Sequence, residues 1–267
     1  MEWFEAIILG LVQGLTEFLP VSSSGHLEIA KELLGVETTD DLMFTTMVHA
    51  ATVLSTVVVF RKQILDLFKG LFRFKYNDET DYVLKIAVSI VPVMIVGLFF
   101  KDQVESLFGS IKVVGFALLA TSALLFFSDF ASRWLKTKSS QGVRNGITYW
   151  QALVVGMAQA LAVIPGLSRS GTTISTGLIC GVRRDVMAQF SFLMVLIPIL
   201  GESFLELVGG EFSSSSVGAL PLFLGFVSAF VSGLFACKVM IALVKKARLS
   251  WFAIYCLIAA ILIFILA

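Results

Sequence analysis

Long apolar stretches with few charged residues dominate the hydropathy pattern of the 267-residue chain. A transmembrane helix needs about 20 consecutive apolar residues, or somewhat fewer when flanking Lys and Arg side chains extend to the interface. Six charge-free stretches are therefore predicted as transmembrane helices: residues 43–60, 86–100, 113–128, 186–201, 212–237 and 249–267. The shortest, 86–100, is expected to extend back through Tyr82 and Lys85.

Two further apolar regions are each interrupted by a segment rich in Pro, Gly and Ser. Residues 3–34 are broken at 20–25, and residues 147–182 are broken at 165–171. Pro and Gly end a helix, and a following Ser suits the N-cap of a new one. Each region is therefore predicted as a re-entrant helix-loop-helix hairpin, whose arms are too short to cross the bilayer. Irregular backbone at membrane depth must be buried in protein or line a cavity.

The basic residues predict the orientation, because cytoplasmic loops carry an excess of Lys and Arg. They gather at 61–75, 133–144, 183–184 and 245–248, which are placed in the cytoplasm. Connections on the other side are acidic or mixed, with acidic residues at 37–41, 102–105 and 202–211. The first hairpin then enters from outside and the second from the cytoplasm. Both termini are predicted to lie outside.

An internal repeat supports this plan. When the chain is shifted by 146 residues, six of the sixteen positions in 10–25 match those in 156–171, against roughly one expected by chance. The matching pairs are Gly10/Gly156, Gln13/Gln159, Leu15/Leu161, Ser22/Ser168, Ser24/Ser170 and Gly25/Gly171. We predict a single all-α membrane domain of inverted-topology repeats, approximately 1–121 and 147–267, joined by a basic cytoplasmic linker. The two re-entrant loops would meet near the midplane, as in transporters.

Composition agrees with a polytopic membrane protein. The chain is 57% hydrophobic and only 15% charged, with a mean hydropathy of +0.92, whereas about a quarter of a soluble chain is charged. The net charge of +1 argues against a nucleic-acid-binding protein. Cys180, Cys237 and Cys256 lie in apolar stretches, so neither disulfides nor a zinc site are expected. The acidic N-terminus is not that of a secretory signal peptide, so the first apolar segment is expected to be retained.

Polar and ionisable residues gather in the two predicted loops. The first brings Gln13, Glu17, Ser22, Ser23, Ser24 and His26, and the second brings Ser168, Arg169, Ser170, Thr172 and Thr173. Ionisable groups at membrane depth are costly and are functional candidates by default. The Arg169 guanidinium suits bidentate binding of phosphate or carboxylate, and helix N-termini favour anions. A phosphate site is therefore predicted, with a structural ion pair between Glu17 and Arg169 as the alternative.

Two spacings suggest specific chemistry. Ser23 and His26 are three residues apart, so an imidazole on a neighbouring helix face could reach the hydroxyl and act as its base. Gln13 and Glu17 are four apart and share one face, where their oxygens could bind Mg²⁺ or Ca²⁺ or orient water. His49 lies in the stretch 43–60 and is interpreted as a packing or hydrogen-bonding residue.

At this point the residues resemble those of a known family. QGLTEFLPVSSSGH (residues 13–26) and PGLSRSGTT (residues 165–173) resemble the two signatures of the undecaprenyl-diphosphate phosphatases, also called bacitracin-resistance proteins. The likeness covers essentially the full chain. Carried over by position, the family's glutamate-rich element falls on Gln13 and Glu17, its serine/histidine element on Ser23 and His26, and its arginine on Arg169. Position 13 is an amide here, which the family pattern allows.

The resemblance implies an enzyme of the bacterial inner membrane that hydrolyses undecaprenyl diphosphate to undecaprenyl phosphate and inorganic phosphate. This reaction recycles the lipid carrier for cell-wall synthesis and confers bacitracin resistance. The resemblance also implies a divalent cation, Mg²⁺ or Ca²⁺, and a membrane-embedded site that opens toward the periplasm. The sequence leaves the oligomeric state open, a homodimer included.

A mechanism follows as a hypothesis. Arg169 and the two helix N-termini hold the diphosphate, together with the hydroxyls of Ser22, Ser24, Ser168, Ser170, Thr172 and Thr173. Ser23 attacks the terminal phosphorus while His26 takes its proton. Glu17, with Gln13, holds the cation or activates water for the second step. Direct attack by water, with Ser23 as a phosphate ligand, is the competing mechanism.

Three other protein classes share part of the pattern. A lipid-phosphate transporter or flippase would fit the inverted repeat and use the same anion site, but it does not need the pair Ser23 and His26. An intramembrane serine protease usually has Gly two residues before its nucleophile, whereas Ser22 precedes Ser24 here. The acid-phosphatase-like lipid phosphatases contain a similar Pro-Ser-Gly-His segment, but their Lys-rich upstream motif is not found, which indicates convergence.

Overall fold

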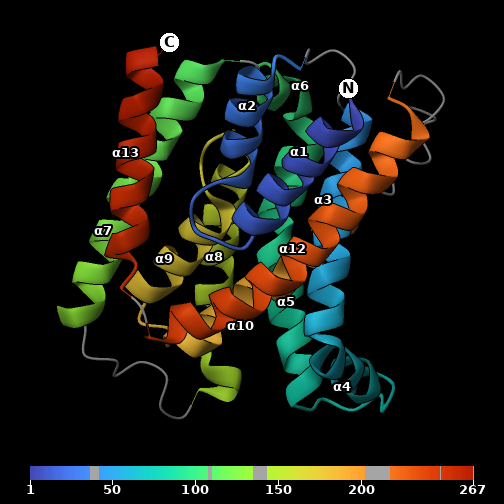
Figure 1. The fold of residues 1–267 in the computed structure, drawn as a ribbon. Coiled ribbons are helices and arrows are strands. Elements are labelled where there is room, and N and C mark those ends of the chain that lie inside the picture. Colours follow the sequence, from blue (N-terminus) through green and yellow to red (C-terminus); the bar gives the residue numbers. More distant parts are fainter. Residues whose placement is uncertain (37–41, 108–109, 135–142, 202–216, 247, 267) are drawn as a thin grey trace.

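The structure, a computed structural model, is a bundle of helices (Figure 1) and describes residues 1–36, 42–107, 110–134, 143–201, 217–246 and 248–266. Across these ranges the regular elements are helical, as predicted for an all-α protein. They are α1 (Trp3–Thr16), α2 (Ser23–Leu34), α3 (Leu42–Val59), α4 (Arg61–Leu71), α5 (Asp78–Phe99), α6 (Lys101–Glu105), α7 (Ile111–Trp134), η2 (Arg144–Gly146), α8 (Tyr149–Leu161), α9 (Arg169–Ile179), α10 (Arg184–Met194), α12 (Ala219–Lys246) and α13 (Ser250–Leu266).

Four helical segments of the described chain are long and apolar enough to cross a membrane: Asp78–Phe99, Ile111–Ser132, Arg184–Gly201 and Ala219–Val244. A fifth is counted if Met43–Val59 and Arg61–Leu71, which meet at a bend of 75°, form one broken span. The sixth predicted stretch forms α13, a helix of 17 residues. At 1.5 Å per residue α13 is about 26 Å long, slightly less than the hydrocarbon core. The chain is therefore a polytopic membrane protein.

Several predicted boundaries differ from the observed helices, and at α12 and α5 the reason is that charged residues at the ends of the apolar stretches are themselves helical. Helix α12 continues nine residues beyond the predicted end at 237, since one exposed lysine, Lys238, does not stop it. Residues 212–216, the predicted start, lie outside the described residues. Helix α5 begins at Asp78, where the side chain of Asn77 accepts a hydrogen bond from the Thr80 amide at 2.8 Å.

The two interrupted regions form the predicted helix-loop-helix hairpins. Helices α1 and α2 occupy the end of the molecule that holds the N-terminus, whereas α8 begins near the opposite end (Figure 1). Both second helices are capped alike, because Ser22 Oγ accepts from the Gly25 amide at 3.3 Å and Ser168 Oγ accepts from the Gly171 amide at 3.1 Å. These caps stand at the same 146-residue offset as the sequence matches.

Hydrogen bonds between the two loops hold the broken backbones together. The Gly166 amide donates to Ser24 Oγ at 3.4 Å, and Ser170 Oγ donates to the Leu19 carbonyl at 3.0 Å. Gly166 has a φ of +89°, and a Cβ there would lie 2.7 Å from the backbone of Val114. These contacts satisfy polar backbone groups that lipid could not.

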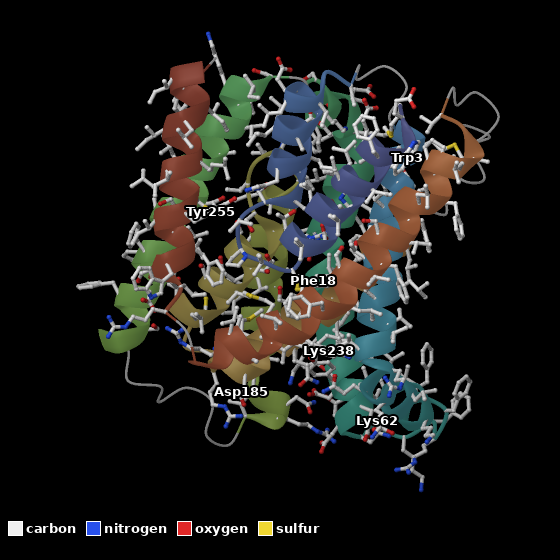
Figure 2. The ribbon with its side chains drawn as sticks, viewed as in Figure 1. Trp3, Phe18, Lys62, Asp185, Lys238 and Tyr255 are labelled. Atoms are coloured by element: carbon white, nitrogen blue, oxygen red, sulfur yellow. The ribbon has the colours of Figure 1, made fainter. Side chains whose placement is uncertain are left out.

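Figure 2 shows the side chains over the whole bundle, with Lys62 and Asp185 near the end opposite Trp3. The first helix of the chain begins, and the last helix ends, at the same end of the molecule, which the N and C labels mark in Figure 1. The acidic segments 37–41 and 202–211 and the linker residues 135–142 fall outside the described residues. The assignment of these segments to the two sides of the membrane therefore stays a prediction.

Each hairpin packs its first helix tightly against a long helix of the other half, α1 on α12 and α8 on α5. Glycines allow both approaches, because a Cβ on Gly10 would meet the carbonyl of Gly225 and one on Gly156 would meet the carbonyl of Ser89. The Ser228 hydroxyl also donates to the Ile7 carbonyl at 2.8 Å. Small residues permit this contact between membrane helices.

Substitution of Gly156 by Ala should destabilise the protein. The new Cβ would press on the Ser89 backbone, which cannot rotate away. Overpacking of this kind costs about 1–3 kcal/mol, which lowers the midpoint of thermal unfolding in detergent. Gly97→Ala on α5 is the matched control, since its Cβ would meet nothing within 4 Å. The control should match wild type or gain up to about 1 kcal/mol from helix propensity. Equal midpoints for the two variants would contradict the proposed close contact.

Candidate active site

Glu17 lies directly after α1 and is the centre of a polar cluster. Its carboxylate is 5% exposed and forms an ion pair with Arg169, the first residue of α9, through Oε1. Its other oxygen, Oε2, accepts hydrogen bonds from Ser23 Oγ at 2.6 Å and from Gln13 Nε2 at 2.9 Å. The two hairpins therefore meet at this carboxylate, and their contact is the ion pair that the sequence offers as the alternative to a phosphate site.

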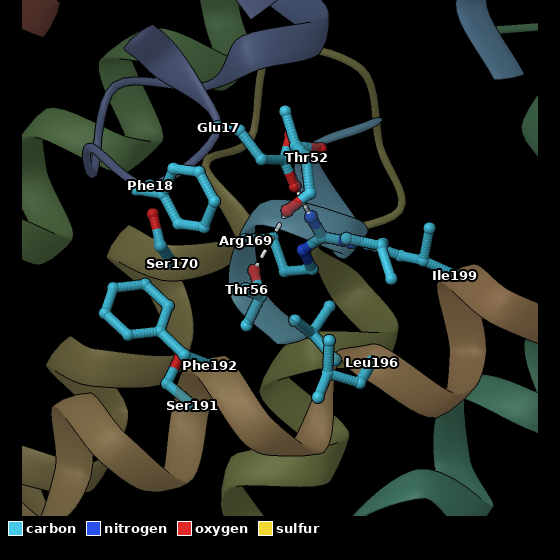
Figure 3. Close-up of a pocket in the computed structure, with 12 residues that line it drawn as sticks. Glu17, Phe18, Thr52, Thr56, Arg169, Ser170, Ser191, Phe192, Leu196 and Ile199 are labelled. Atoms are coloured by element: carbon cyan, nitrogen blue, oxygen red, sulfur yellow. Dashed lines mark hydrogen bonds and ion pairs between the residues drawn. The ribbon is translucent and has the colours of Figure 1, made fainter. Parts of the chain in front are cut away.

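A pocket opens beside the ion pair (Figure 3). Glu17 and Arg169 face each other there, and Arg169 keeps 28% of its side chain exposed. The other walls come from α3, through Thr52 and Thr56, and from the apolar residues Phe192, Val195, Leu196 and Ile199. The pocket thus places the ion pair beside an apolar wall.

Ser23 and His26 are not paired, contrary to the expectation from their spacing. His26 Nδ1 lies 2.7 Å from the Ser22 carbonyl, and Nε2 lies 2.7 Å from the Tyr255 hydroxyl, whose ring stacks on the imidazole. Because a carbonyl only accepts, Nδ1 carries the proton and Nε2 accepts from Tyr255. Residues three apart on a helix point about 60° away from each other. Ser23 therefore faces Glu17 while His26 faces α13.

The remaining hydroxyls expected to bind phosphate have partners within the protein. Ser22 and Ser168 cap α2 and α9, while Ser24 and Ser170 join the loops. On α9, Thr173 Oγ1 lies 2.7 Å from Ser191 Oγ. Thr172 differs, since its Oγ1 is buried and has no hydrogen-bond partner among the described residues. The four serines therefore hold the two loops and the starts of α2 and α9 in place.

Two residues near the site were not anticipated from the sequence. His49 Nε2 on α3 lies 3.9 Å from Glu17 Oε2, whereas the sequence predicts only packing or a hydrogen bond for His49. An imidazole in an otherwise apolar helix was the available signal. Tyr255 contacts His26 from 229 residues away. No local pattern marks such a contact.

The carboxylate and amide oxygens at Glu17 and Gln13 are suitable ligands for a hard divalent cation. Gln13 is fully buried, and its Oε1 has no hydrogen-bond partner in the described structure, which leaves an oxygen free to bind a cation. Carboxylate and amide oxygens are the ligands that Mg²⁺ and Ca²⁺ prefer. Across the described ranges, no three His, Cys, Asp or Glu side chains gather around one point. A cation here would therefore need oxygens from Gln13 and from a ligand.

Comparison with known proteins gives a family for this arrangement. Residues 6–262 match the model of the bacitracin resistance protein BacA family. A protein of Bacteroides fragilis named undecaprenyl-diphosphatase is 53% identical over 98% of this chain and 97% of its own length. Proteins of the same name from Parabacteroides distasonis (98% of this chain, 97% of that protein) and Christiangramia forsetii (100% and 99%) are 54% and 48% identical. The chain belongs to the bacitracin resistance protein BacA family.

Proposed function

We propose that this protein is an integral membrane phosphatase that hydrolyses undecaprenyl diphosphate to undecaprenyl phosphate and inorganic phosphate. The reaction recycles the lipid carrier for cell-wall synthesis and confers resistance to bacitracin. The observation that carries the proposal is the Ser23 hydroxyl, which donates at 2.6 Å to the carboxylate that also binds Arg169. The family and the name shared by its relatives support it.

A lipid-phosphate transporter or flippase is the less favoured function. A carrier needs an anion site, which Arg169 could supply, but it needs no hydroxyl activated by a carboxylate. The bond from Ser23 to Glu17 is the arrangement expected of a nucleophile and its base. Release of inorganic phosphate from undecaprenyl diphosphate by the purified protein distinguishes the two functions.

The geometry changes the proposed base from His26 to Glu17. Arg169 binds the terminal phosphate and stabilises the charge that develops on it. Ser23 Oγ attacks the phosphorus while Glu17 takes its proton, the bond from phosphorus to the bridging oxygen breaks, and undecaprenyl phosphate leaves with that proton. Water then attacks the phosphoserine, and Glu17 takes a proton from the water and returns it to Ser23. Attack by water on the diphosphate, with Ser23 as a ligand, remains the competing mechanism.

A divalent cation completes the proposal. Gln13 and Glu17 would hold Mg²⁺ or Ca²⁺, which when bound would neutralise charge on the diphosphate oxygens. His26, turned toward Tyr255, takes no part in deprotonating Ser23 in this mechanism. The capping and loop serines keep the two helix N-termini directed at the phosphate.

The inverted repeat and the orientation belong to the same proposal. Two hairpins entering from opposite ends, with matching caps at Ser22 and Ser168, support repeats of approximately 1–121 and 147–267. In the bacterial inner membrane, the excess of basic residues on the predicted cytoplasmic connections supports termini outside and a site that opens toward the periplasm.

Replacement of Arg169 by Ala should lower kcat/KM for undecaprenyl diphosphate by about 10²–10³-fold, because loss of one transition-state donor costs about that much. Arg169→Lys should recover only part of the activity, since an ammonium cannot bind two oxygens in a planar fork. Phosphate release in detergent measures both. Arg183→Ala is the matched control, since Arg183 is exposed and pairs only locally with Asp185. Wild-type rates for Arg169→Ala would exclude its role.

Replacement of Ser23 by Ala distinguishes the two mechanisms. If Ser23 is the nucleophile, phosphate release should fall to background, and wild-type protein quenched during turnover of substrate with a radiolabelled terminal phosphate should carry label on Ser23. Ser106→Ala is the control, because the exposed Ser106 hydroxyl bonds only to the Gln103 carbonyl of its own helix. Substantial release by Ser23→Ala, with no label on wild type, would instead favour direct attack by water.

A further inference from the structure

The two oxygens of the Glu17 carboxylate face different partners. Oε1 is paired with Arg169, whereas Oε2 faces Gln13, Ser23 and His49. The Arg169 side is therefore the anion side of the cluster, whereas on the other side Oε2 accepts hydrogen bonds from the uncharged side chains of Ser23 and Gln13. A cation bound to Glu17 would belong on the Oε2 side.

The His49 ring is oriented as a metal-binding histidine is. Nδ1 lies 2.8 Å from the Thr45 carbonyl, so Nδ1 carries the proton and Nε2 presents its lone pair. A ligating histidine almost always donates its other ring N–H to a carbonyl or carboxylate in this way. With the proton on Nδ1, Nε2 directs its lone pair toward Glu17 Oε2, and a cation between the two atoms would bind both.

The separation of these atoms agrees with a shared ion. At 3.9 Å, Nε2 and Oε2 are too far apart for a hydrogen bond. Two ligand atoms bound to one ion at about 2.1 Å each lie about 3.0–4.2 Å apart, depending on the angle at the ion. Gln13 Oε1 supplies the second observation, because it is buried and lacks a partner among the described residues. Such an atom costs about 1–3 kcal/mol unless something satisfies it.

We propose that His49 is the third protein ligand of the divalent cation that Gln13 and Glu17 hold, an inference that rests on the proposed function. A nitrogen ligand changes the selectivity of the site, since imidazole suits later transition metals such as Fe²⁺ and Ni²⁺, whereas oxygen ligands suit Mg²⁺, Ca²⁺ and Mn²⁺. His49 therefore adds more to the affinity for Mn²⁺, a transition metal that also accepts nitrogen, than to the affinity for Ca²⁺. Helix α3 thereby joins the two hairpins as a third contributor to the active site.

Electron spin echo modulation of bound Mn²⁺ tests the ligand directly. The chain contains two histidines, His26 and His49, so protein purified without a histidine tag has two imidazole sources. Mn²⁺ added at one equivalent should show nitrogen modulation in wild type and in His26→Gln, but not in His49→Gln. His49→Gln should also weaken Mn²⁺ binding at least about 10-fold while changing Ca²⁺ affinity less, by competition titration.

Each result decides the question. Nitrogen modulation that persists in His49→Gln, or bound Mn²⁺ without modulation in wild type, would overturn the assignment, as would the absence of stoichiometric Mn²⁺ binding. The thermal unfolding midpoint shows whether His49→Gln is folded. Phosphate release from undecaprenyl diphosphate by the same wild-type sample reports the proposed function separately. A protein that releases phosphate without a nitrogen signal keeps its function and loses His49 as a ligand.

Discussion

A carboxylate buried among apolar helices must be paired, and Glu17 meets this requirement with Arg169, which lies 152 positions further along the chain. For these groups to touch, both hairpins have to reach the interior of the bundle, which requires a break in each apolar region. The broken backbones then need partners of their own, which the loop serines supply. The close helix contacts at Gly10 and Gly156 hold the hairpins against the long helices. Much of the architecture therefore follows from one ion pair.

In the proposed mechanism, the ion pair between Glu17 and Arg169 opens when the substrate binds. Removing either partner of a buried ion pair costs about 3–5 kcal/mol, because the remaining charge is left unpaired. A diphosphate can replace Glu17 as the partner of Arg169, so binding of substrate need not leave the guanidinium unpaired. The carboxylate that Arg169 leaves already accepts the Ser23 hydrogen bond, so it is in place to take the Ser23 proton. Substrate binding and activation of the nucleophile are thereby coupled in the proposed mechanism.

The sequence predicts the elements better than it predicts side-chain partners. The breaks at 20–25 and 165–171 can be predicted because Pro and Gly act locally. The contact between Glu17 and Arg169 follows from the sequence only as the alternative to a phosphate site, because isolated charges in apolar segments need partners. The partners of Ser23 and His26 cannot be predicted, since spacing gives the faces of a helix but not what packs on each face. His49 and Tyr255 reach the site from other helices. Such contacts depend on tertiary packing, which no local pattern encodes.

In the proposed repeat, the two hairpins share the same capped helix starts but carry different side chains at equivalent positions. At the 146-residue offset, Ser23 corresponds to Arg169, and both stand as the first residue of a capped helix. These equivalent positions both bind the Glu17 carboxylate, one through a hydroxyl and one through a guanidinium.

The carboxylate itself occurs in only one of the two hairpins, because the position equivalent to Glu17 is Val163. Gln13 therefore finds a partner four residues on, whereas the equivalent Gln159 is buried with both amide atoms unpartnered in the described structure. An unsatisfied buried amide costs about 1–3 kcal/mol. The first residues of α2 and α9 thus both reach the Glu17 carboxylate, and in the proposed mechanism this one carboxylate is the base for Ser23 while Arg169 binds phosphate. A second carboxylate at Val163 would compete for Arg169 and remove that distinction.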